Sequence, residues 1–134
     1  MSGTFQIRGG KRLQGEITPQ GAKNEALQIL CAVLLTDEEV RIKNIPDIHD
    51  VNRLIEILGD FGVEVTKNGH GDFTFKANSV NFDYIKSNEF KKDGAKLRGS
   101  IMLMGPMLAR YGEAYMPTPG GDKIGRRRLD THFQ

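Results

Sequence analysis

Residues suited to acid–base and anion-binding chemistry are concentrated between Pro119 and Arg128. This run holds one carboxylic acid, Asp122, with three glycines, Gly120, Gly121 and Gly125, and four cations, Lys123, Arg126, Arg127 and Arg128. Guanidinium groups hold phosphate or carboxylate through paired hydrogen bonds, and glycines let a loop turn or move. The composition suits a lid that closes on a phosphorylated substrate, and it suits a solvated basic loop equally well. No Gly-Lys-Ser/Thr follows the glycine spacing that a P-loop requires.

A second group of candidate residues precedes a predicted helix. Lys23 and Asn24 follow Gly21, and a helix N-terminus attracts anions through its free amides. A lysine there opposes the helix dipole, which hints at a bound anion, although a solvated surface lysine is the simpler interpretation of the spacing alone. Arg98 lies near the start of another predicted helix, where the simpler interpretation is again a surface side chain that extends along apolar neighbours.

The remaining reactive residue types predict no metal or thiol chemistry. His49, His70 and His132 lack metal-ligand spacing, and the single cysteine, Cys31, falls in an apolar segment typical of an inert core residue. One cysteine implies no disulfide and no oxidising compartment. These residues give no reason to expect a metal site.

The bulk composition narrows the class of protein and its partners. The 134 residues are 38% hydrophobic and 27% charged, which is enough for a single folded domain. The formal net charge of +2 gives no reason to expect nucleic acid or a membrane surface as a partner. The first eleven residues lack an apolar stretch of signal-peptide length, so a cytoplasmic protein is expected.

The elements that must position these residues follow from periodicity. Predicted strands cover residues 5–8, 13–18, 39–43, 63–66, 72–76 and 113–116, and predicted helices cover 25–35, 50–61 and 95–110. Asp50 is the expected N-cap of the second helix and Gly62 its C-terminal glycine, while Asn68-Gly69 is the expected hairpin turn. Pro106 should kink or break the third helix, and Gly112 should end it. The order indicates an α/β protein built from repeated β-α-β-α-β-β units, the second one incomplete.

Three motifs carry a resemblance to the UDP-N-acetylglucosamine enolpyruvyl transferases. They are residues 13–17 with 21–27, residues 97–101 with 105–112, and the loop 119–122 with 124–127 and 129–130. They occur in the family's order across nearly the whole chain. The resemblance implies transfer of the enolpyruvyl group of phosphoenolpyruvate to the 3-hydroxyl of UDP-N-acetylglucosamine, with release of phosphate, in peptidoglycan synthesis. It also implies that the reaction uses no metal and no organic cofactor.

The same resemblance assigns roles to individual residues. It implies that Lys23, Asn24 and Arg98 contact substrate, and that Arg127, Leu129 and Asp130 belong to the segment that meets the nucleotide. Asp122 stands where most members have the cysteine that donates a proton and is alkylated by fosfomycin, so the resemblance implies an aspartate proton donor and fosfomycin resistance. Arg128 and Thr131 depart from the family's usual residues.

The resemblance also implies an architecture larger than this chain. Members have two inside-out α/β barrel domains with the active site between them. Residues 1–19 are then expected to be strands that pack on the other domain, and residues 20–134 to be a truncated first domain. The fragment should be inactive without the missing C-terminal part of its own chain. The alternatives are a relative of the shikimate-pathway enolpyruvyl transferase, or a non-catalytic module that binds nucleotide or phosphate.

Overall fold

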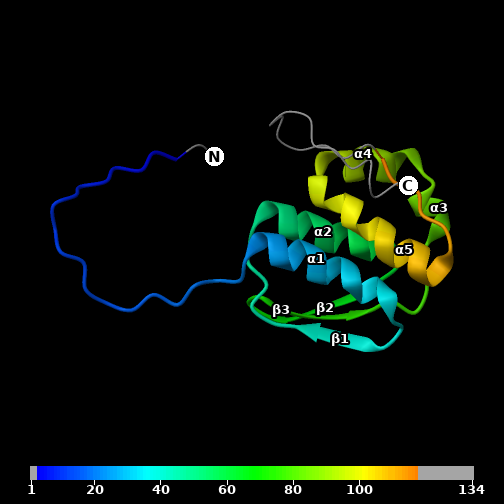
Figure 1. Cartoon of the computed structure of the whole chain (residues 1–134), viewed down its shortest axis with the longest axis horizontal. Helices are drawn as coiled ribbons and strands as arrows, with labels where there is room; N and C mark the ends of the chain where they lie inside the picture. Colours follow the sequence, from blue (N-terminus) through cyan, green and yellow to red (C-terminus); the bar gives the residue numbers. More distant parts are fainter. Residues whose placement is uncertain (1–2, 118–134) are drawn as a thin grey trace.

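A three-stranded antiparallel sheet is covered by α-helices on one face (Figure 1). The computed structural model describes residues 3–117. The helices are α1 (Lys23–Ala32), α2 (His49–Asp60), α3 (Phe82–Ile85), α4 (Asn88–Lys96) and α5 (Met104–Tyr111), with 3-10 turns η1 (Val33–Leu35) and η2 (Arg98–Leu103). The strands are β1 (Glu39–Ile42), β2 (Glu64–Gly69) and β3 (Asp72–Lys76), in the spatial order β1-β3-β2. The prediction of an α/β protein is therefore confirmed. No helix in this part of the chain is long and apolar enough to cross a membrane.

The sheet divides into an apolar face and a polar face because its side chains alternate. Phe75 in the central strand lies opposite Val40 on one side and Val65 on the other. Directly opposed residues point to the same face, so these three side chains form one apolar surface. Phe75 is fully buried there, and burying such a side chain stabilises the fold by about 1.5–3 kcal/mol.

Helix α1 begins two residues before the predicted start, and its last predicted turn is the 3-10 turn η1. Leu30 and Leu34 are fully buried. The Arg110 guanidinium donates to the carbonyl oxygens of Leu34 (3.1 Å) and Thr36 (2.8 Å). A cation at this end satisfies carbonyl groups that the helix leaves unpaired. Arg110 thereby ties the end of α1 and η1 to α5.

Helix α2 confirms the predicted C-terminal glycine and corrects the predicted N-cap. Gly62 has φ of 95°, its amide donates to the Gly59 carbonyl (2.9 Å), and the Val63 amide donates to the Leu58 carbonyl (3.0 Å). These paired bonds form a Schellman motif. Asp50, however, is the second residue of the helix, and the N-cap is Ile48 without a side-chain bond. Because the helix already begins at His49, Asp50 lies in its first turn and its carboxylate bonds Lys23 of α1 instead.

The β2–β3 hairpin forms as predicted, but its turn lies two residues later than Asn68-Gly69. Gly69 pairs with Asp72, so the turn consists of His70 and Gly71, and the register is irregular between Lys67 and Gly69. Gly71 has φ of 64°, which favours glycine. The irregularity absorbs Asn68, whose amide donates to the Thr74 hydroxyl at 2.8 Å.

The predicted helix over residues 95–110 is wrong as a single element. It is divided into the end of α4, the 3-10 turn η2 and helix α5, with an extended Leu97 (φ −116°, ψ 112°) at the first break. Pro106 breaks nothing, because it is the third residue of α5 and a first turn tolerates proline. Gly112 ends α5 with φ of 73°, as predicted. The predicted strand 113–116 does not form, since no neighbouring strand among residues 3–117 pairs with it.

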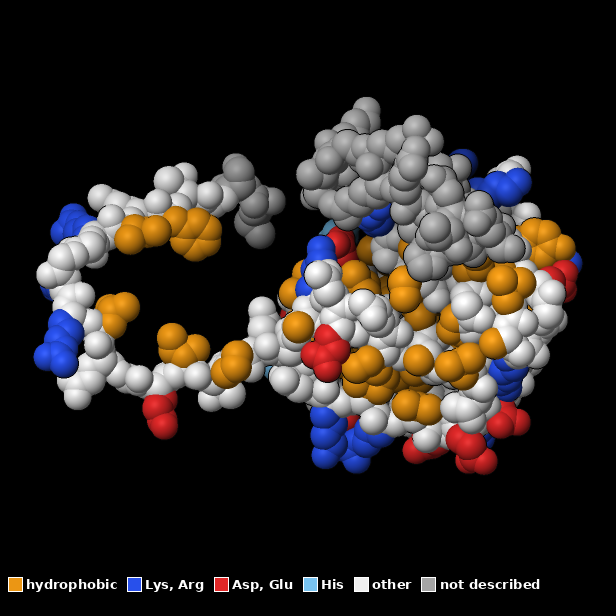
Figure 2. Space-filling view, viewed as in Figure 1, with side chains coloured by type: hydrophobic (Ala, Val, Ile, Leu, Met, Phe, Trp, Pro, Cys, Tyr) orange, Lys and Arg blue, Asp and Glu red, His pale blue; other side chains and the backbone are white. Residues whose placement is uncertain are grey.

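Residues 3–20 form an extended arm that leaves the body (Figure 1), and the predicted strands 5–8 and 13–18 are both absent. The arm's apolar side chains are almost fully exposed, with Phe5 and Leu13 at 92%, and Figure 2 shows hydrophobic side chains along the arm away from the body. Strands require a partner for their backbone groups, and the arm contacts none in the described chain. The leading strand of the predicted repeat is therefore missing here.

Candidate functional site

The candidate residues Lys23 and Asn24 are the first two residues of α1, and the chain enters this helix through a tight approach. A Cβ on Gly21 would collide with the carbonyl oxygen of Asn44 and would lie 3.3 Å from Pro46 Cδ. Only glycine fits this contact without a shift of the backbone. Gly21 therefore fixes where α1 starts and where Lys23 leaves it.

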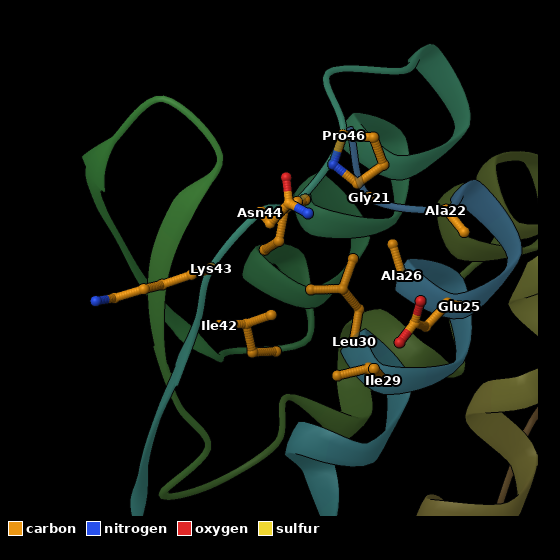
Figure 3. Close-up of a pocket in the computed structure, with 11 residues that line it drawn as sticks. Gly21, Ala22, Glu25, Ala26, Ile29, Leu30, Ile42, Lys43, Asn44 and Pro46 are labelled. Carbon is orange, nitrogen blue, oxygen red and sulfur yellow. The ribbon is translucent and has the colours of Figure 1, made fainter. Parts of the chain in front are cut away.

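The hollow beside this entry is a poor anion site. It has a volume of about 100 Å³ and lies between the start of α1 and the end of β1. Figure 3 shows Lys43 pointing away from it, while the Glu25 carboxylate lies on the α1 side of the hollow among apolar side chains that include Ile42 and Leu30. A carboxylate without a facing cation repels phosphate, so this hollow is not where we place a phosphorylated ligand.

Lys23 is bound to Asp50 of α2. Its Nζ lies 2.7 Å from the Asp50 carboxylate, and the two side chains are 44% and 38% exposed. Asp50 is in the first turn of α2, where a negative charge is favoured, and Lys23 is in the first turn of α1, where a positive charge is not. The carboxylate thus compensates the unfavourable position of the lysine.

A pocket of about 280 Å³ opens next to this ion pair. It is lined by His49, Asp50, Arg53, Glu56, Lys96 and Leu97. These residues come from the first two turns of α2 and from the junction of α4 with η2. The pocket therefore lies between three helix ends and carries both charge signs.

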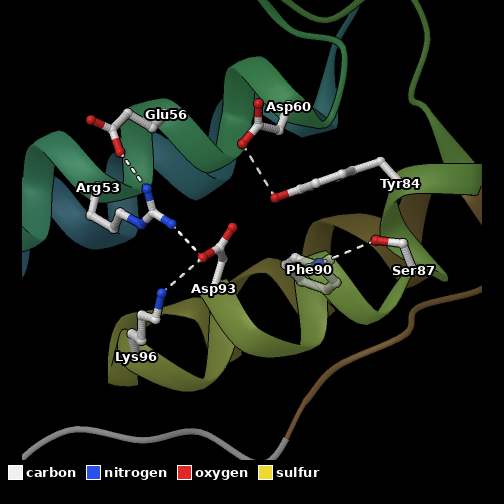
Figure 4. Close-up of polar contacts among 8 residues, drawn as sticks. All are labelled: Arg53, Glu56, Asp60, Tyr84, Ser87, Phe90, Asp93 and Lys96. Atoms are coloured by element: carbon white, nitrogen blue, oxygen red, sulfur yellow. Dashed lines mark hydrogen bonds and ion pairs between the residues drawn. The ribbon is translucent and has the colours of Figure 1, made fainter.

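Arg53 and Lys96 of this pocket are joined through one carboxylate (Figure 4). Arg53 bonds Glu56 at 2.6 Å and also pairs with Asp93, which Lys96 reaches at 3.3 Å. Partial burial of the Asp93 carboxyl opposes ionisation, but the hydrogen bonds and charges of Lys96 and Arg53 outweigh it and lower its pKa. Asp93 is therefore a fixed anion that clamps α4 to α2.

Arg98 is the first residue of η2 and follows Leu97, which lines the pocket together with Asp50, the partner of Lys23. Its neighbour Gly99 packs on Leu27, near the middle of α1, where an added Cβ would lie 3.2 Å from the leucine side chain. Arg98 is half-buried, and within residues 3–117 no carboxylate or carbonyl bonds its guanidinium. With Lys23, Arg53 and Lys96 each beside a carboxylate, Arg98 supplies the surplus positive charge of this region.

Cys31 has the inert environment predicted for it. The thiol is buried, donates to the Leu27 carbonyl at 3.1 Å, and burial raises its pKa to about 12. A thiol with that pKa is protonated near neutral pH and is a poor nucleophile. Among the described residues, no group of three or more metal-ligand side chains is gathered in one place.

The structure brings together some of the predicted site residues and leaves others undescribed. Lys23 and Asn24 begin α1, and Arg98 follows Leu97, which shares a pocket with the Lys23 partner Asp50. The predicted residues Asp122, Arg127, Leu129 and Asp130 lie outside the described residues. Sequence reasoning missed Asp50, Arg53, Asp93 and Lys96 as parts of the site. The spacing of Arg53 with Glu56 and of Asp93 with Lys96 was an available signal, whereas the Lys23–Asp50 pair spans 27 positions and gave none.

The chain is similar to curated enzymes from several bacteria. It is 61% identical to a UDP-N-acetylglucosamine 1-carboxyvinyltransferase of Bacteroides fragilis, and 60% and 57% identical to those of Bacteroides thetaiotaomicron and Porphyromonas gingivalis. Each match covers 97% of this chain and 30% of the relative. The chain therefore spans about a third of the length of the curated relatives it matches.

Two further comparisons concern the family and the fold. The crystal structure of the enolpyruvyl transferase NikO from Streptomyces tendae matches with a TM-score of 0.57 and 27% identity, over 79% of this chain and 24% of that one. The family model of EPSP synthase (3-phosphoshikimate 1-carboxyvinyltransferase) matches residues 7–134. With nearly the whole chain matched, from the exposed arm through the helix ends that carry Lys23 and Arg98, this protein belongs to the EPSP synthase family.

Proposed function

We propose that the intact protein transfers the enolpyruvyl group of phosphoenolpyruvate to the 3-hydroxyl of UDP-N-acetylglucosamine and releases phosphate. The names of the relatives that are 57–61% identical support this acceptor. One structural observation carries the proposal: Lys23 bonds Asp50, which lines one pocket with Leu97, so Lys23 and Arg98, 75 positions apart in sequence, come from neighbouring segments of the fold. Phosphoenolpyruvate has a phosphate and a carboxylate, and a group of cations suits both.

The proposed chemistry assigns a separate task to each part of the chain. Lys23 and Arg98 bind the anionic groups as charge shifts during addition and elimination. Asp122 protonates the methylene carbon of phosphoenolpyruvate as general acid, which requires a carboxyl kept protonated by desolvation and by nearby phosphate charge. Asn24, Arg127, Leu129 and Asp130 are the further proposed substrate contacts. The reaction needs no step by Cys31, whose thiol stays protonated.

The proposed architecture is that of a larger molecule. Residues 20–134 would be part of the first of two inside-out α/β barrel domains, and residues 1–19 would pack on the other domain. The exposed apolar side chains of the arm support this arrangement, since such surface is normally covered. On this proposal the 134-residue chain alone releases no phosphate, because the cations of the second domain are missing.

The test is phosphate release by the intact protein with both substrates present. Asp122→Asn keeps the shape of the side chain and removes the proton, so turnover should fall at least about a hundredfold. Asp122→Cys is the matched control, because a thiol can replace the acid. It should retain turnover and gain time-dependent inactivation by fosfomycin, with mass added at residue 122. Near-normal turnover of Asp122→Asn would reject Asp122 as the proton donor.

Two other functions remain as outcomes of this assay. Turnover with 3-phosphoshikimate in place of the sugar nucleotide would indicate the shikimate-pathway reaction, which the description of the matching family model names. Binding of the sugar nucleotide without turnover by the intact protein would indicate a non-catalytic binding module. The identity of the relatives favours the sugar nucleotide over both.

A further inference from the structure

Asp50 links the N-termini of two helices at the proposed site. Its carboxylate bonds Lys23 of α1 at 2.7 Å from the first turn of α2, and it also lines the 280 Å³ pocket with Arg53 and Lys96. The other acid of this pocket, Glu56, bonds Arg53 instead, and Glu25 of α1 lines the separate hollow near β1. Asp50 is therefore the acidic side chain that connects Lys23 to the pocket.

The Lys23–Asp50 ion pair adds little to the stability of the fold, but it restricts where the lysine side chain lies. Partly exposed pairs stabilise folded proteins only weakly, because water screens the charges and ordering the side chains costs entropy. A lysine ammonium on a four-carbon stem has many rotamers, and a fixed acceptor selects those that reach it. The Lys23 ammonium is thereby kept on the side of α1 that faces α2 and the pocket.

We propose that Asp50 is a positioning residue that holds the Lys23 ammonium at the pocket between α2 and the α4–η2 junction, ready for an anionic substrate group. This inference rests on the proposed function, in which Lys23 binds phosphoenolpyruvate. Holding a reacting partner in place before substrate arrives lowers the barrier, and a displacement of about 1 Å can cost up to a hundredfold in rate. Asp50 also repels the substrate anion, so removing its charge favours substrate binding and offsets the weaker binding by a misplaced Lys23. The loss should therefore appear in kcat more than in KM.

The test compares Asp50→Asn, Lys23→Ala and the double variant in the intact protein. Asp50→Asn should lower kcat about tenfold and change KM for phosphoenolpyruvate less than about threefold. In the Lys23→Ala background the same substitution should have no further effect, because the group it positions is gone. Asp50→Glu, which keeps the charge, should recover part of the loss. Unchanged kinetics in Asp50→Asn, or losses that multiply in the double variant, would overturn the proposal.

Asp72→Asn is the matched control, because it removes a carboxylate from an equally short pair with Arg41, at 2.7 Å, on the sheet. Its kinetics should equal those of the wild type. A second readout does not depend on turnover: the rate of acetylation of Lys23 by an amine-reactive reagent, followed by peptide mass spectrometry. Asp50→Asn should raise this rate severalfold and Asp72→Asn should not.

The two readouts separate the two hypotheses. A wild-type protein that fails to turn over, while acetylation of Lys23 still responds to Asp50→Asn, would reject the proposed function and retain the ion pair as a positioning contact. If the wild-type enzyme is active and Asp50→Asn changes neither kcat nor the acetylation rate of Lys23, the role of Asp50 is rejected and the proposed function is retained. If Asp50→Asn fails to fold, Asp50→Glu must show an altered acetylation rate, or the proposal is rejected.

Discussion

Strand β1 and residues 5–8 have the same apolar alternation and opposite outcomes. In β1, Val40 and Ile42 lie opposite Phe75 and Phe73 and pack against the core. In the arm, Phe5 and Ile7 are 92% and 89% exposed, and no strand forms. The apolar alternation predicts which face a strand would bury, but a strand forms only where another segment of the molecule pairs with it. β1 finds β3, 33 positions further along, and the arm finds no partner in the described chain.

This difference separates a body that is stable through its own contacts from an arm that is not. Among residues 3–117, every apolar side chain that is 0% exposed lies between Leu30 and Leu103. The arm from residue 3 to residue 20 adds no residue to the core. The separation predicts that equal substitutions in the two regions have very different effects on the free energy of unfolding.

The largest effect is expected from truncation of the central core aromatic. Phe75→Ala should destabilise the 134-residue chain by about 3–5 kcal/mol, because it removes a fully buried ring and leaves a cavity. Phe5→Ala is the matched control and should change the free energy of unfolding by less than about 0.5 kcal/mol. Urea unfolding of both variants measures the difference. Comparable losses in the two variants would show that the arm is packed in solution.

Much of the body could be predicted from sequence because its signals are local. The apolar stripe of α2, with Val51, Leu54 and Leu58, is fully buried, and Gly62 ends the helix through bonds within one turn. Helix α4 was missed because it has only two buried positions, Phe90 and Gly94, among polar residues. Its start signal was present in Ser87, whose hydroxyl accepts the Phe90 amide at 3.1 Å.

The candidate site was less predictable because its contacts are tertiary. The resemblance supplied Lys23 and Arg98, but no local pattern connects either residue to its neighbours. Asp50 was mistaken for a helix cap because Asp is a good cap residue, whereas in the fold its carboxylate bonds Lys23. Pairings of this kind depend on how helices dock, and the sequence around each residue does not encode them.

The junction between arm and body offers the next largest effect. Gly21→Ala should destabilise the 134-residue chain by about 1–3 kcal/mol, because the new Cβ meets the Asn44 carbonyl and the backbone must shift. Gly9→Ala, in the arm, places its Cβ in open space and should be neutral. Thermal unfolding of both variants is the measurement. If Gly21→Ala left the free energy of unfolding unchanged, the backbone at residue 21 would be able to shift away from the Asn44 carbonyl without cost.

The pH dependence of the free energy of unfolding should distinguish the body from the arm, with a smaller effect than the two substitutions above. The pKa of Asp93 lies below its ordinary value of 3.8, so its ion pairs stabilise the body fully above that pH. The contribution is lost as the pH falls through the lower folded value, where the carboxyl becomes protonated in the native state too. Asp93→Asn should remove about 1.5 kcal/mol at neutral pH and flatten this part of the acid profile. Glu16→Gln in the arm is the control, and a profile altered equally by both would contradict the assignment.

The smallest effect should come from removing the arm itself. Deletion of residues 1–18 eliminates side chains that are exposed in the described chain, so the free energy of unfolding should change by less than about 0.5 kcal/mol. Among residues 3–117 of the 134-residue chain, trypsin should cut first at Arg8, Lys11 or Arg12, because exposed extended backbone fits a protease without local unfolding. In the intact protein the same bonds should resist cleavage, if residues 1–19 pack on a second domain as proposed. The comparison is made by mass spectrometry of early digests of both proteins. Equal cleavage rates in the two would mean that the arm stays uncovered, and the proposed packing would then be wrong even if the enzyme is active.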